Sequence, residues 1–520
     1  MAKRLFQKER SLTGVDSLGI SVFLGEIYTN TGFPCGNLAD LDRLALWCKK
    51  VGFNSLWLGP IWLMDPQIGL APYSVSSRLF IDPLYLPDFE SRELPGAILD
   101  RDIQSDIEYE HNLGKVLWAR RAETAKSYLV ADLSRLRANP LFSLDVENWL
   151  RTELTDDMLG LLADAYFKIA FWDQPQDKPN RSDLIEKAVA AQAIGYGYLR
   201  KINGIIALGL DLPVGVSPNG IDSEEFSNWT IKDGQIGAPP DFFNANGQRW
   251  GLTGFSFSAN SVSIEDFAPL SLPLKLYSTV ASAVRIDHAI GLERLCVIRE
   301  NTDENDEWYY FVHQPRQAML DLLVELTKSL HFDIVAEDLG VVPETLRHSL
   351  VESGIALMKV LCFEDHELAQ QHGQNMAMLT THDAPTAAWL ITADEISDED
   401  EKLMANKLKM HANRVFSGPK VEISKDFRSI VCHSGQYETQ TNEYLESWLP
   451  RLVSYLLKIE SKFAVISLRD LLADQNRLNR PGTSAVERLN FFQALSLGAS
   501  SYAKLLELNV LFEVTYVDTY

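Results

Sequence analysis

Several short apolar runs in this chain end in a carboxylate, and three of them carry residues suited to acid–base chemistry. They are residues 283–288 (AVRIDH), 333–340 (DIVAEDLG) and 378–383 (MLTTHD). A buried strand that ends in Asp or Glu places an acid at the mouth of a sheet or barrel, where burial and neighbouring charges shift its pKa. Several acids at such a mouth are typical of an enzyme that works with paired carboxylates.

Arg285 and Asp287 are two residues apart in the first run and therefore share one face of a strand. A guanidinium beside a carboxylate lowers the carboxylate pKa and fixes its orientation, which suits a nucleophile that must be ionised. A structural ion pair at a strand end explains the same two residues equally well.

Glu337 lies near the end of the second run, and nearby acids in a partly dry cleft would raise its pKa to that of a general acid. Capping of the turn before Gly340 is the alternative, and we expect that role for Asp338.

In the third run, Asp383 follows His382. Taken alone, Asp383 is explained as the N-cap of a helix that begins near Pro385. Three acidic strand ends in one fold favour the catalytic interpretation.

Eight continuous, apolar runs of strand length predict parallel strands that are buried on both faces. Helical segments separate several of them, including residues 317–330 and 343–352. This alternation predicts an α/β fold, a (β/α)8 TIM barrel. The eight runs are residues 19–26, 55–60, 204–213, 283–288, 333–340, 358–363, 376–383 and 463–470.

Two segments are too long to be simple loops of a single catalytic barrel domain that spans residues 1–520. Residues 61–203, after the second strand, are mostly helical in pattern. Residues 214–282, after the third strand, are rich in Gly, Pro, Asn and aromatic residues and have little helical periodicity. Insertions at strand ends build substrate clefts, so we expect residues 214–282 to lie over the active face. After Leu471 we expect a loop and a final helix pair.

Composition excludes several classes of partner. Lys and Arg number 48 and Asp and Glu 71, which gives a net charge of −23. With no basic stripe, a nucleic-acid or anionic membrane partner is not expected, and a neutral or weakly charged substrate fits better. The charged residues 1–10 are followed by no apolar signal core, no stretch reaches the length of a membrane span, and the five cysteines are scattered. We therefore expect a cytoplasmic protein with reduced thiols.

Two aromatic segments fit a sugar ligand. Residues 238–251 (APPDFFNANGQRWG) include Trp250, and residues 71–85 place Tyr73 near the end of the second strand. Flat aromatic faces stack on the apolar faces of pyranose rings, while Asn, Gln and Ser bind the hydroxyl groups. Packing of a large insertion explains each aromatic residue when it is taken alone.

Taken together, these stretches resemble the 4-α-glucanotransferases, the amylomaltases or disproportionating enzymes of glycoside hydrolase family 77. That family has a β/α barrel with inserted subdomains, here after strands 2 and 3, and no C-terminal β-sandwich. The matching motifs, in the family's order, are LGP (58–60), APYS (71–74), DLPVGV (211–216), GAPPDFFNANGQRWG (237–251), VRIDH (284–288), AEDLG (336–340), THDAPT (381–386) and RLNRPGT (477–483).

The resemblance implies that Asp287 is the nucleophile, Glu337 the acid/base and Asp383 the transition-state stabiliser. An α-1,4-glucan segment would pass from a maltooligosaccharide or starch-like donor to the 4-hydroxyl of an acceptor glucose or glucan, by a retaining double displacement. No cofactor and no metal are implied. The substrate-binding residues implied are Tyr73, Asp211, Gln248, Trp250, Arg285, His288, His382 and Asn479.

Three other functions use the same features. An α-glucan hydrolase would use the same carboxylates, with water in place of the acceptor sugar. A metal-dependent barrel enzyme of enolase-like type would bind Mg²⁺ with acids at consecutive strand ends and would need a lysine base, for which Lys359 is the one candidate. A non-catalytic glucan-binding protein would keep the aromatic loops and need none of the three acids.

Overall fold

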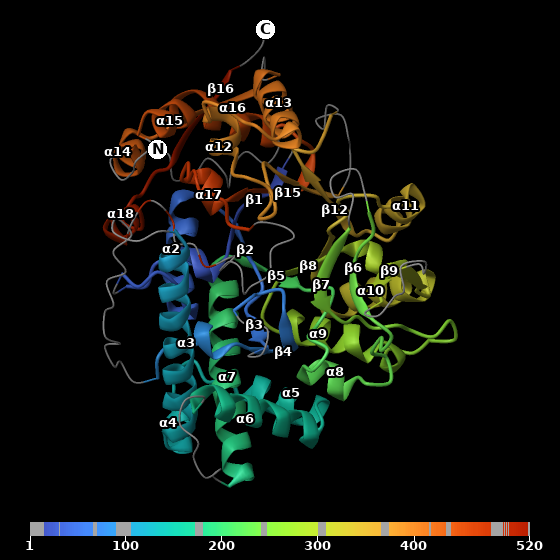
Figure 1. Ribbon diagram of the computed structural model, residues 1–520. Coiled ribbons are helices and arrows are strands. Elements are labelled where there is room, and N and C mark those ends of the chain that lie inside the picture. The colour runs from blue at the N-terminus through green and yellow to red at the C-terminus, as the bar shows by residue number, and fades with distance from the viewer. Residues whose placement is uncertain are drawn as a thin grey trace.

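Eight parallel strands close into a barrel at the centre of the molecule, as the computed structural model shows (Figure 1). Each of the eight predicted runs overlaps one barrel strand, so the predicted TIM barrel is confirmed, with boundaries that differ by a few residues. The structure describes residues 15–30, 32–65, 70–89, 106–171, 180–240, 247–299, 308–365, 374–414, 418–432, 438–479, 492, 495, 497 and 499–517. Around the barrel, the strands are β1 (Val15–Val22), β2 (Ser55–Leu58), β5 (Ala207–Leu212), β8 (Ala283–Ile286), β11 (Asp333–Ala336), β12 (Ala356–Val360), β13 (Asn375–Met378) and β15 (Ser461–Ser467), which pairs with β1 again.

The barrel interior combines large and small residues. Trp57 of β2 packs edge-on against Phe463 of β15, with ring centroids 5.0 Å apart. Its neighbours on β1 and β5 are Gly19 and Gly209, and a Cβ at Gly209 would lie 2.3 Å from the Trp57 ring. Glycine at these positions leaves the volume that the indole fills, because protein interiors are packed without spare space.

Helices with local start and stop signals cover the barrel. In α2 (Leu38–Val51) the Asn37 side chain accepts hydrogen bonds from the N–H groups of Ala39 and Asp40, and Gly52 ends the helix in the left-handed region at φ 112°. Both features satisfy backbone groups that a helix end leaves unpaired. The predicted helices between β8 and β12 are confirmed as α10 (Arg316–Leu330) and α11 (Glu344–Glu352).

The segment between β2 and β5 forms the lower part of the view in Figure 1. There the buried Arg121 guanidinium forms a bidentate ion pair with the Asp82 carboxylate. Nε lies 2.9 Å from Oδ1, and Nη2 lies 2.6 Å from Oδ2. Whether the predicted 61–203 insertion is a separate subdomain stays a prediction. The elements of the segment are β3 (Trp62–Met64), β4 (Val75–Ile81), η3 (Pro83–Tyr85), α3 (Asp106–Val130), α4 (Leu133–Arg137), α5 (Leu144–Glu153), α6 (Asp156–Ala170) and α7 (Arg181–Ile205).

The segment between β5 and β8 contains more regular structure than its sequence predicts. The expectation of little helical periodicity is wrong for α9, which has Pro269 in its first turn and Pro273 inside. Its apolar side chains are buried against the barrel, and tertiary packing outweighs the low helix propensity. The remaining elements are α8 (Ile221–Glu225), β6 (Gln235–Ala238), β7 (Gln248–Leu252), η4 (Glu265–Phe267) and α9 (Ala268–Ser278). After β8 come η5 (Ala289–Leu292), β9 (Arg294–Ile298) and β10 (Tyr309–His313), and β10-β9-β6-β7 form an antiparallel sheet.

The last described element of the chain is a strand. Of the expected final helix pair the structure describes one helix, α18 (Ala499–Leu505), and most of residues 480–498, where the other would lie, are outside the described residues; β16 (Phe512–Val517), which follows α18, was not expected. β16 pairs antiparallel with β14 (Gly418–Ile423), and its sequence FEVTYV is rich in the β-branched and aromatic residues that favour strands. The other elements are η2 (Leu24–Glu26), α12 (Ala387–Thr392), α13 (Glu399–Asn413), α14 (Lys425–Cys432), α15 (Glu438–Glu443), the π-helical η7 (Tyr444–Trp448), α16 (Leu449–Leu456) and α17 (Leu468–Leu471).

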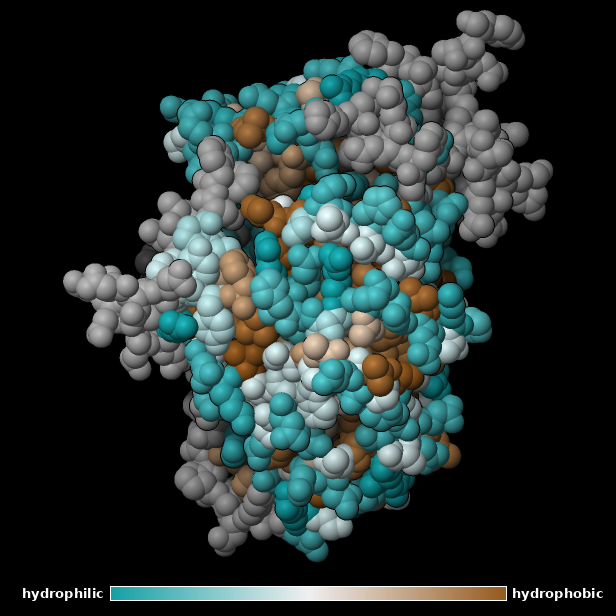
Figure 2. Space-filling model, turned by 90° about the vertical axis from the view of Figure 1, so that its right-hand side faces the viewer, coloured by the Kyte–Doolittle hydropathy of each residue, from teal (hydrophilic) through white to brown (hydrophobic). Residues whose placement is uncertain are grey.

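The face turned toward the viewer in Figure 2 is mainly hydrophilic, and its hydrophobic residues gather in small, separated groups. Within the described ranges, no helix combines the length and the apolar character needed to cross a membrane.

We expect Gly209→Ala to destabilise the protein, because the new methyl group would overlap the Trp57 ring. The expected loss is about 1–3 kcal/mol in the free energy of unfolding, measured by urea denaturation. Gly204→Ala near the end of α7 is the matched control, since nothing lies within 4 Å of its Cβ. Equal stability of the two variants would contradict the packing that we describe.

Candidate active site

The ends of β8 and β11 bring two of the predicted acids side by side. Ile286 and Ala336 are partners in the parallel ladder, and the Glu337 N–H continues the ladder by donating to the Ile286 carbonyl at 3.0 Å. Asp287 and Glu337 follow these partners, so their backbones are about 4.8 Å apart, the usual spacing between neighbouring strands. Residues at one register level of a parallel pair point to the same face, which directs both carboxyl groups to the same side of the barrel mouth.

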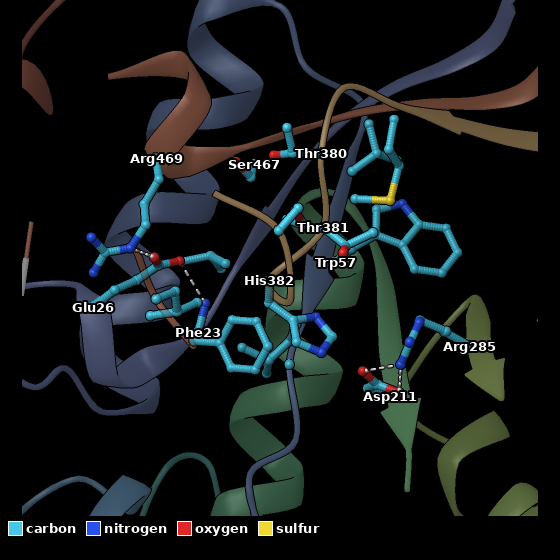
Figure 3. A pocket seen from close by; sticks show the side chains of 18 of the residues that line it. Phe23, Glu26, Trp57, Asp211, Arg285, Thr380, Thr381, His382, Ser467 and Arg469 are labelled. Atoms are coloured by element: carbon cyan, nitrogen blue, oxygen red, sulfur yellow. Dashed lines mark hydrogen bonds and ion pairs between the residues drawn. The ribbon is translucent and has the colours of Figure 1, made fainter. Parts of the chain in front are cut away.

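Arg285 bridges two carboxylates at this mouth. Its Nη2 lies 3.0 Å from Oδ1 of Asp287, and its Nη1 lies 2.8 Å from both carboxylate oxygens of Asp211 on the neighbouring β5. Asp211 and Arg285 are register partners, so the ion pair runs straight across two adjacent strands. The Tyr73 hydroxyl donates to Oδ2 of Asp211 at 2.7 Å and completes the group. Figure 3 shows the Asp211–Arg285 pair at the edge of a cavity.

The charges at this mouth keep Arg285 protonated. Burial disfavours its charge, but Asp211, Tyr73 and Asp287 outweigh that effect and hold the pKa of Arg285 well above its usual range. Burial likewise raises the pKa of Asp211, and Arg285 opposes this shift. Asp287 therefore has a cation at 3.0 Å, which holds its carboxylate in one orientation.

Glu337 has a different environment from Asp287. Burial raises its pKa to about 7, with Arg285 acting against the shift and the charge of Asp287 adding to it. Its Oε2 accepts the His288 N–H at 2.7 Å and its Oε1 accepts the Leu339 N–H at 3.0 Å, and both bonds lower the pKa. A carboxyl with a pKa near 7 is present in both protonation states at neutral pH, as an acid that later acts as a base requires.

Asp338, the neighbour of Glu337, is buried and lies 2.9 Å from Nε of Arg347 and 3.7 Å from Nζ of Lys359. The capping of the turn that we expected from Asp338 is made by Glu337, whose Oε1 accepts the Leu339 N–H, whereas the Asp338 carboxylate is bound to these two basic side chains. These contacts also show Lys359, the candidate base of the enolase-like alternative, held in an ion pair. Within the described ranges, no group of three or more His, Cys, Asp or Glu side chains is arranged to hold a metal ion.

His288 connects the acids to the aromatic insertion. It adopts the left-handed backbone conformation at φ 49°, which is uncommon for a non-glycine residue, and its N–H donates to Glu337. Its ring packs edge-on against Trp250 of β7, with centroids 4.9 Å apart, and burial lowers its pKa. The Trp250 Nε1–H donates to Oε1 of Gln248 at 3.1 Å. Gln248, Trp250 and His288 therefore form one wall beside the two acids.

Asp383 lies on the loop after β13, with its side chain half exposed. Asn479 Nδ2 donates to its Oδ1 at 2.5 Å, and His382 Nε2 lies 3.3 Å from its Oδ2. The His382 ring stacks on Tyr73 with centroids 5.2 Å apart and an interplanar angle of 21°. Because Tyr73 contacts Asp211, this stack joins the loop of Asp383 to the Arg285 group.

Two cavities adjoin these residues. One, of about 740 Å³, is lined by Asp211, Arg285 and His382, with Trp57 and the three methionines 358, 376 and 378 among its apolar side chains (Figure 3). The other, of about 480 Å³, is lined by Asp287 and His288 together with mainly apolar residues. The predicted site residues thus gather in one network with cavities on two sides. Residues 241–246 of the aromatic loop and 480–483 of the RLNRPGT motif lie outside the described residues.

Sequence reasoning missed three acidic or basic residues that support the site. Asp470 accepts hydrogen bonds from the Thr380 hydroxyl and the Ala387 N–H, both at 2.6 Å, and so fixes both ends of the loop that carries Asp383. The signal was present, because residues 463–470 are another apolar run that ends in an acid. Glu26 and Arg469 form a buried ion pair at 2.9 Å beside the larger cavity, and no local pattern indicates their pairing.

Comparison with known proteins finds similarity to one family of enzymes. A family model described as 4-alpha-glucanotransferase, glycoside hydrolase family 77, matches residues 199–491. The chain is 24% identical to a 4-alpha-glucanotransferase of Mycobacterium tuberculosis over 520 residues, covering 91% of this chain and 70% of that protein. It is 23% identical to one of Haemophilus influenzae, covering 90% of this chain and 74% of that protein.

Two solved structures have the same fold. The amylomaltase of Corynebacterium glutamicum superposes with a TM-score of 0.64 at 19% identity, covering 94% of this chain and 73% of that one. The amylomaltase of Streptococcus agalactiae, in complex with acarbose, gives 0.61 at 15% identity and covers 95% and 98%.

We expect the stability of the protein to fall between pH 5 and pH 8, in part because of Glu337. Its folded-state pKa of about 7 lies above the ordinary value of 4.5, so the folded state binds the proton more tightly than the unfolded chain. This contribution is full below about pH 4.5 and is lost as the pH rises through 7. In Glu337→Gln the fall in the free energy of unfolding should be smaller by about 1–3 kcal/mol.

Urea denaturation at several pH values measures this difference. Glu344→Gln on α11 is the control, because the Glu344 side chain is 85% exposed. An identical pH dependence in Glu337→Gln and the wild type would contradict the buried environment of Glu337.

Proposed function

Because the chain belongs to the 4-alpha-glucanotransferase family, whose model matches more than half of it, we propose how this glycosyl-transferring enzyme works and on which glucans. It moves an α-1,4-glucan segment from a donor maltooligosaccharide or starch-like glucan to the 4-hydroxyl of an acceptor glucose or glucan. The observation that carries the mechanism is the pairing of two unlike carboxyl groups. Asp287 is bound to Arg285, and Glu337 accepts the N–H of the residue that follows Asp287.

In the first displacement, protonated Glu337 gives its proton to the glycosidic oxygen while Asp287 attacks the anomeric carbon. The C–O bond to the leaving sugar breaks and a β-glucosyl ester on Asp287 forms. The different environments of the two acids support this division of roles. Arg285 at 3.0 Å holds the Asp287 carboxylate in one orientation, and burial raises the pKa of Glu337 to about 7.

In the second displacement, Glu337, now a carboxylate, removes the proton from the 4-hydroxyl of the acceptor. The acceptor oxygen attacks the anomeric carbon and displaces Asp287, so the α-configuration is restored. Asp383 binds hydroxyl groups of the donor sugar and stabilises the transition state. Its support from Asn479 and His382 fits a carboxylate that must be held in place while half exposed.

The walls of the site suit a sugar ring. Tyr73, His382 and Trp250 offer flat faces or edges, while Asp211 and Gln248 offer oxygen acceptors for hydroxyl groups. We assign Tyr73, Asp211, Arg285, His288 and His382 to the donor sugar, and Gln248, Trp250 and Asn479 to sugars further along the glucan. The two predicted insertion subdomains and the cytoplasmic location stay predictions.

We expect maltotriose as sole substrate to yield glucose together with oligosaccharides longer than maltotriose, measured by chromatography. Transfer to a sugar acceptor gives this profile, because the glucosyl-enzyme meets a sugar hydroxyl before water. Shorter sugars alone would instead support the α-glucan hydrolase, and no turnover at all would contradict both enzymatic functions.

We expect kcat/KM for maltotriose to decrease as the pH rises through about 7. The first displacement requires protonated Glu337, and its pKa in the folded protein is about 7. The pH–rate profile of the free enzyme measures this pKa as its basic limb. A profile that stays flat from pH 6 to pH 9 would contradict the role of Glu337 as the acid.

A further inference from the structure

Three charged side chains are buried together where the ends of β1 and β15 meet. Glu26 and Asp474 are each 2% exposed, and Arg469 is 3% exposed. Arg469 Nε donates to Oε2 of Glu26 at 2.9 Å, while its Nη1 donates to Oδ2 of Asp474 at 2.8 Å. One guanidinium thus joins segments that are 443 residues apart. Figure 3 shows Glu26 and Arg469 beside the cavity, on the side away from Asp211 and Arg285.

Through Glu26, this group contacts the cavity wall. Oε1 of Glu26 accepts the Phe23 N–H at 2.8 Å, which fixes the backbone that carries the Phe23 ring. That ring packs edge-on against His382, with centroids 5.3 Å apart, and lies in one apolar cluster with Leu478 and Tyr73. Glu26 therefore positions the Phe23 ring, which packs against the His382 imidazole, and His382 in turn contacts Asp383.

Through Asp474, the group is connected to Asp383. Oδ1 of Asp474 accepts the Asn476 N–H at 2.9 Å, and the Asp474 carbonyl accepts the Thr386 hydroxyl at 2.6 Å. The same short loop then supplies Arg477, which donates to the Asp383 carbonyl at 3.2 Å, and Asn479, which donates to its carboxylate at 2.5 Å.

Backbone strain marks the start of this loop. Ala473 adopts φ 53°, in the left-handed region, at a cost of about 1 kcal/mol for a residue with a Cβ. This conformation lets the Asp474 N–H donate to the Arg469 carbonyl at 2.9 Å and turns the Asp474 carboxylate toward the guanidinium.

Buried charges rarely stabilise a fold. Removing three charged groups from water costs about as much as their mutual attraction returns, and apolar side chains of similar volume would fill the space at least as well. Burial raises the pKa of Glu26 to about 7 in spite of its ion pair with Arg469, which agrees with a costly environment. We therefore expect these three side chains to contribute little to stability. Their effect is on the geometry of the site, because they contact segments on two sides of it.

We propose that Glu26, Arg469 and Asp474 form a positioning triad that holds Asp383 and the Phe23–His382 wall in the geometry that catalysis requires. The proposal rests on the function proposed above and adds residues that act through Asp383. The bridge uses two donors, Nε and Nη1, that are fixed in one plane; the ammonium group of lysine has three donors on a flexible stem and would not hold the two carboxylates in this geometry.

The test is the kinetics of Arg469→Lys with maltotriose, at a temperature about 20 °C below the Tm of the variant. We expect kcat to fall about tenfold or more, with KM changed less than about threefold, because a small displacement of a catalytic group is enough to slow the chemistry. In an Asp383→Asn background, the same substitution should change kcat less than about twofold, since both act on one step.

Arg121→Lys is the matched control. Arg121 is fully buried and binds Asp82 through Nε and Nη2, and it lies in the segment between β2 and β5. Its hydrogen bonds and ion pair with described residues go to Asp82 and the Met64 carbonyl, neither of which is a site residue. Its substitution should lower the Tm and leave kcat unchanged.

Glu26→Gln is the second variant, because it keeps the side-chain shape and loses one of the two hydrogen bonds. We expect its kcat to fall about threefold or more. Folded variants with wild-type kcat would overturn the triad alone, whereas a wild type that does not disproportionate maltotriose would overturn the proposed function. Loss of folding in both variants, with Arg121→Lys folded, would assign the triad a structural role and overturn the proposal as well.

Discussion

The bridge that Arg285 makes between Asp211 and Asp287 is the interaction on which the rest of the site depends. Two carboxylates on adjacent strands repel each other, and burial makes that repulsion stronger. One guanidinium in ladder register with Asp211 binds both carboxylates and holds Asp287 in one orientation. Tyr73 and, through its stacking, His382 are placed by the same group. Loss of Arg285 would therefore disturb both Asp287 and the Tyr73–His382 wall.

The barrel supplies what this network needs. Parallel strands set Asp287 and Glu337 next to each other at one register level, and the loops that follow provide different surroundings for the two acids. One carboxylate has a cation as neighbour, while the other has burial, a like charge and two backbone N–H groups. A double displacement requires two carboxyl groups with different roles, and burial raises the pKa of Glu337 to about 7.

Much of this could be predicted from the sequence, because the chemistry follows continuous strand patterns. Runs such as residues 283–288 and 333–340 are apolar and have acids near their ends, so the barrel and its paired carboxylates could be predicted from them. Other features of the fold could not be predicted in this way. α9 contains Pro273, and its helix depends on tertiary packing. β16 pairs with β14, which is far away in the sequence. The bridge from Arg469 to Glu26 spans 443 residues, and no local spacing carries that information.

The most direct test of the central claim is to identify the residue that carries the glycosyl group during turnover. A fluorinated α-glycosyl fluoride that forms the covalent intermediate faster than it is released would label the enzyme, and peptide mass spectrometry would locate the label. The structure predicts one glycosyl group as an ester of Asp287, and no label in Asp287→Asn. A label on another residue, or full turnover by Asp287→Asn, would contradict the account.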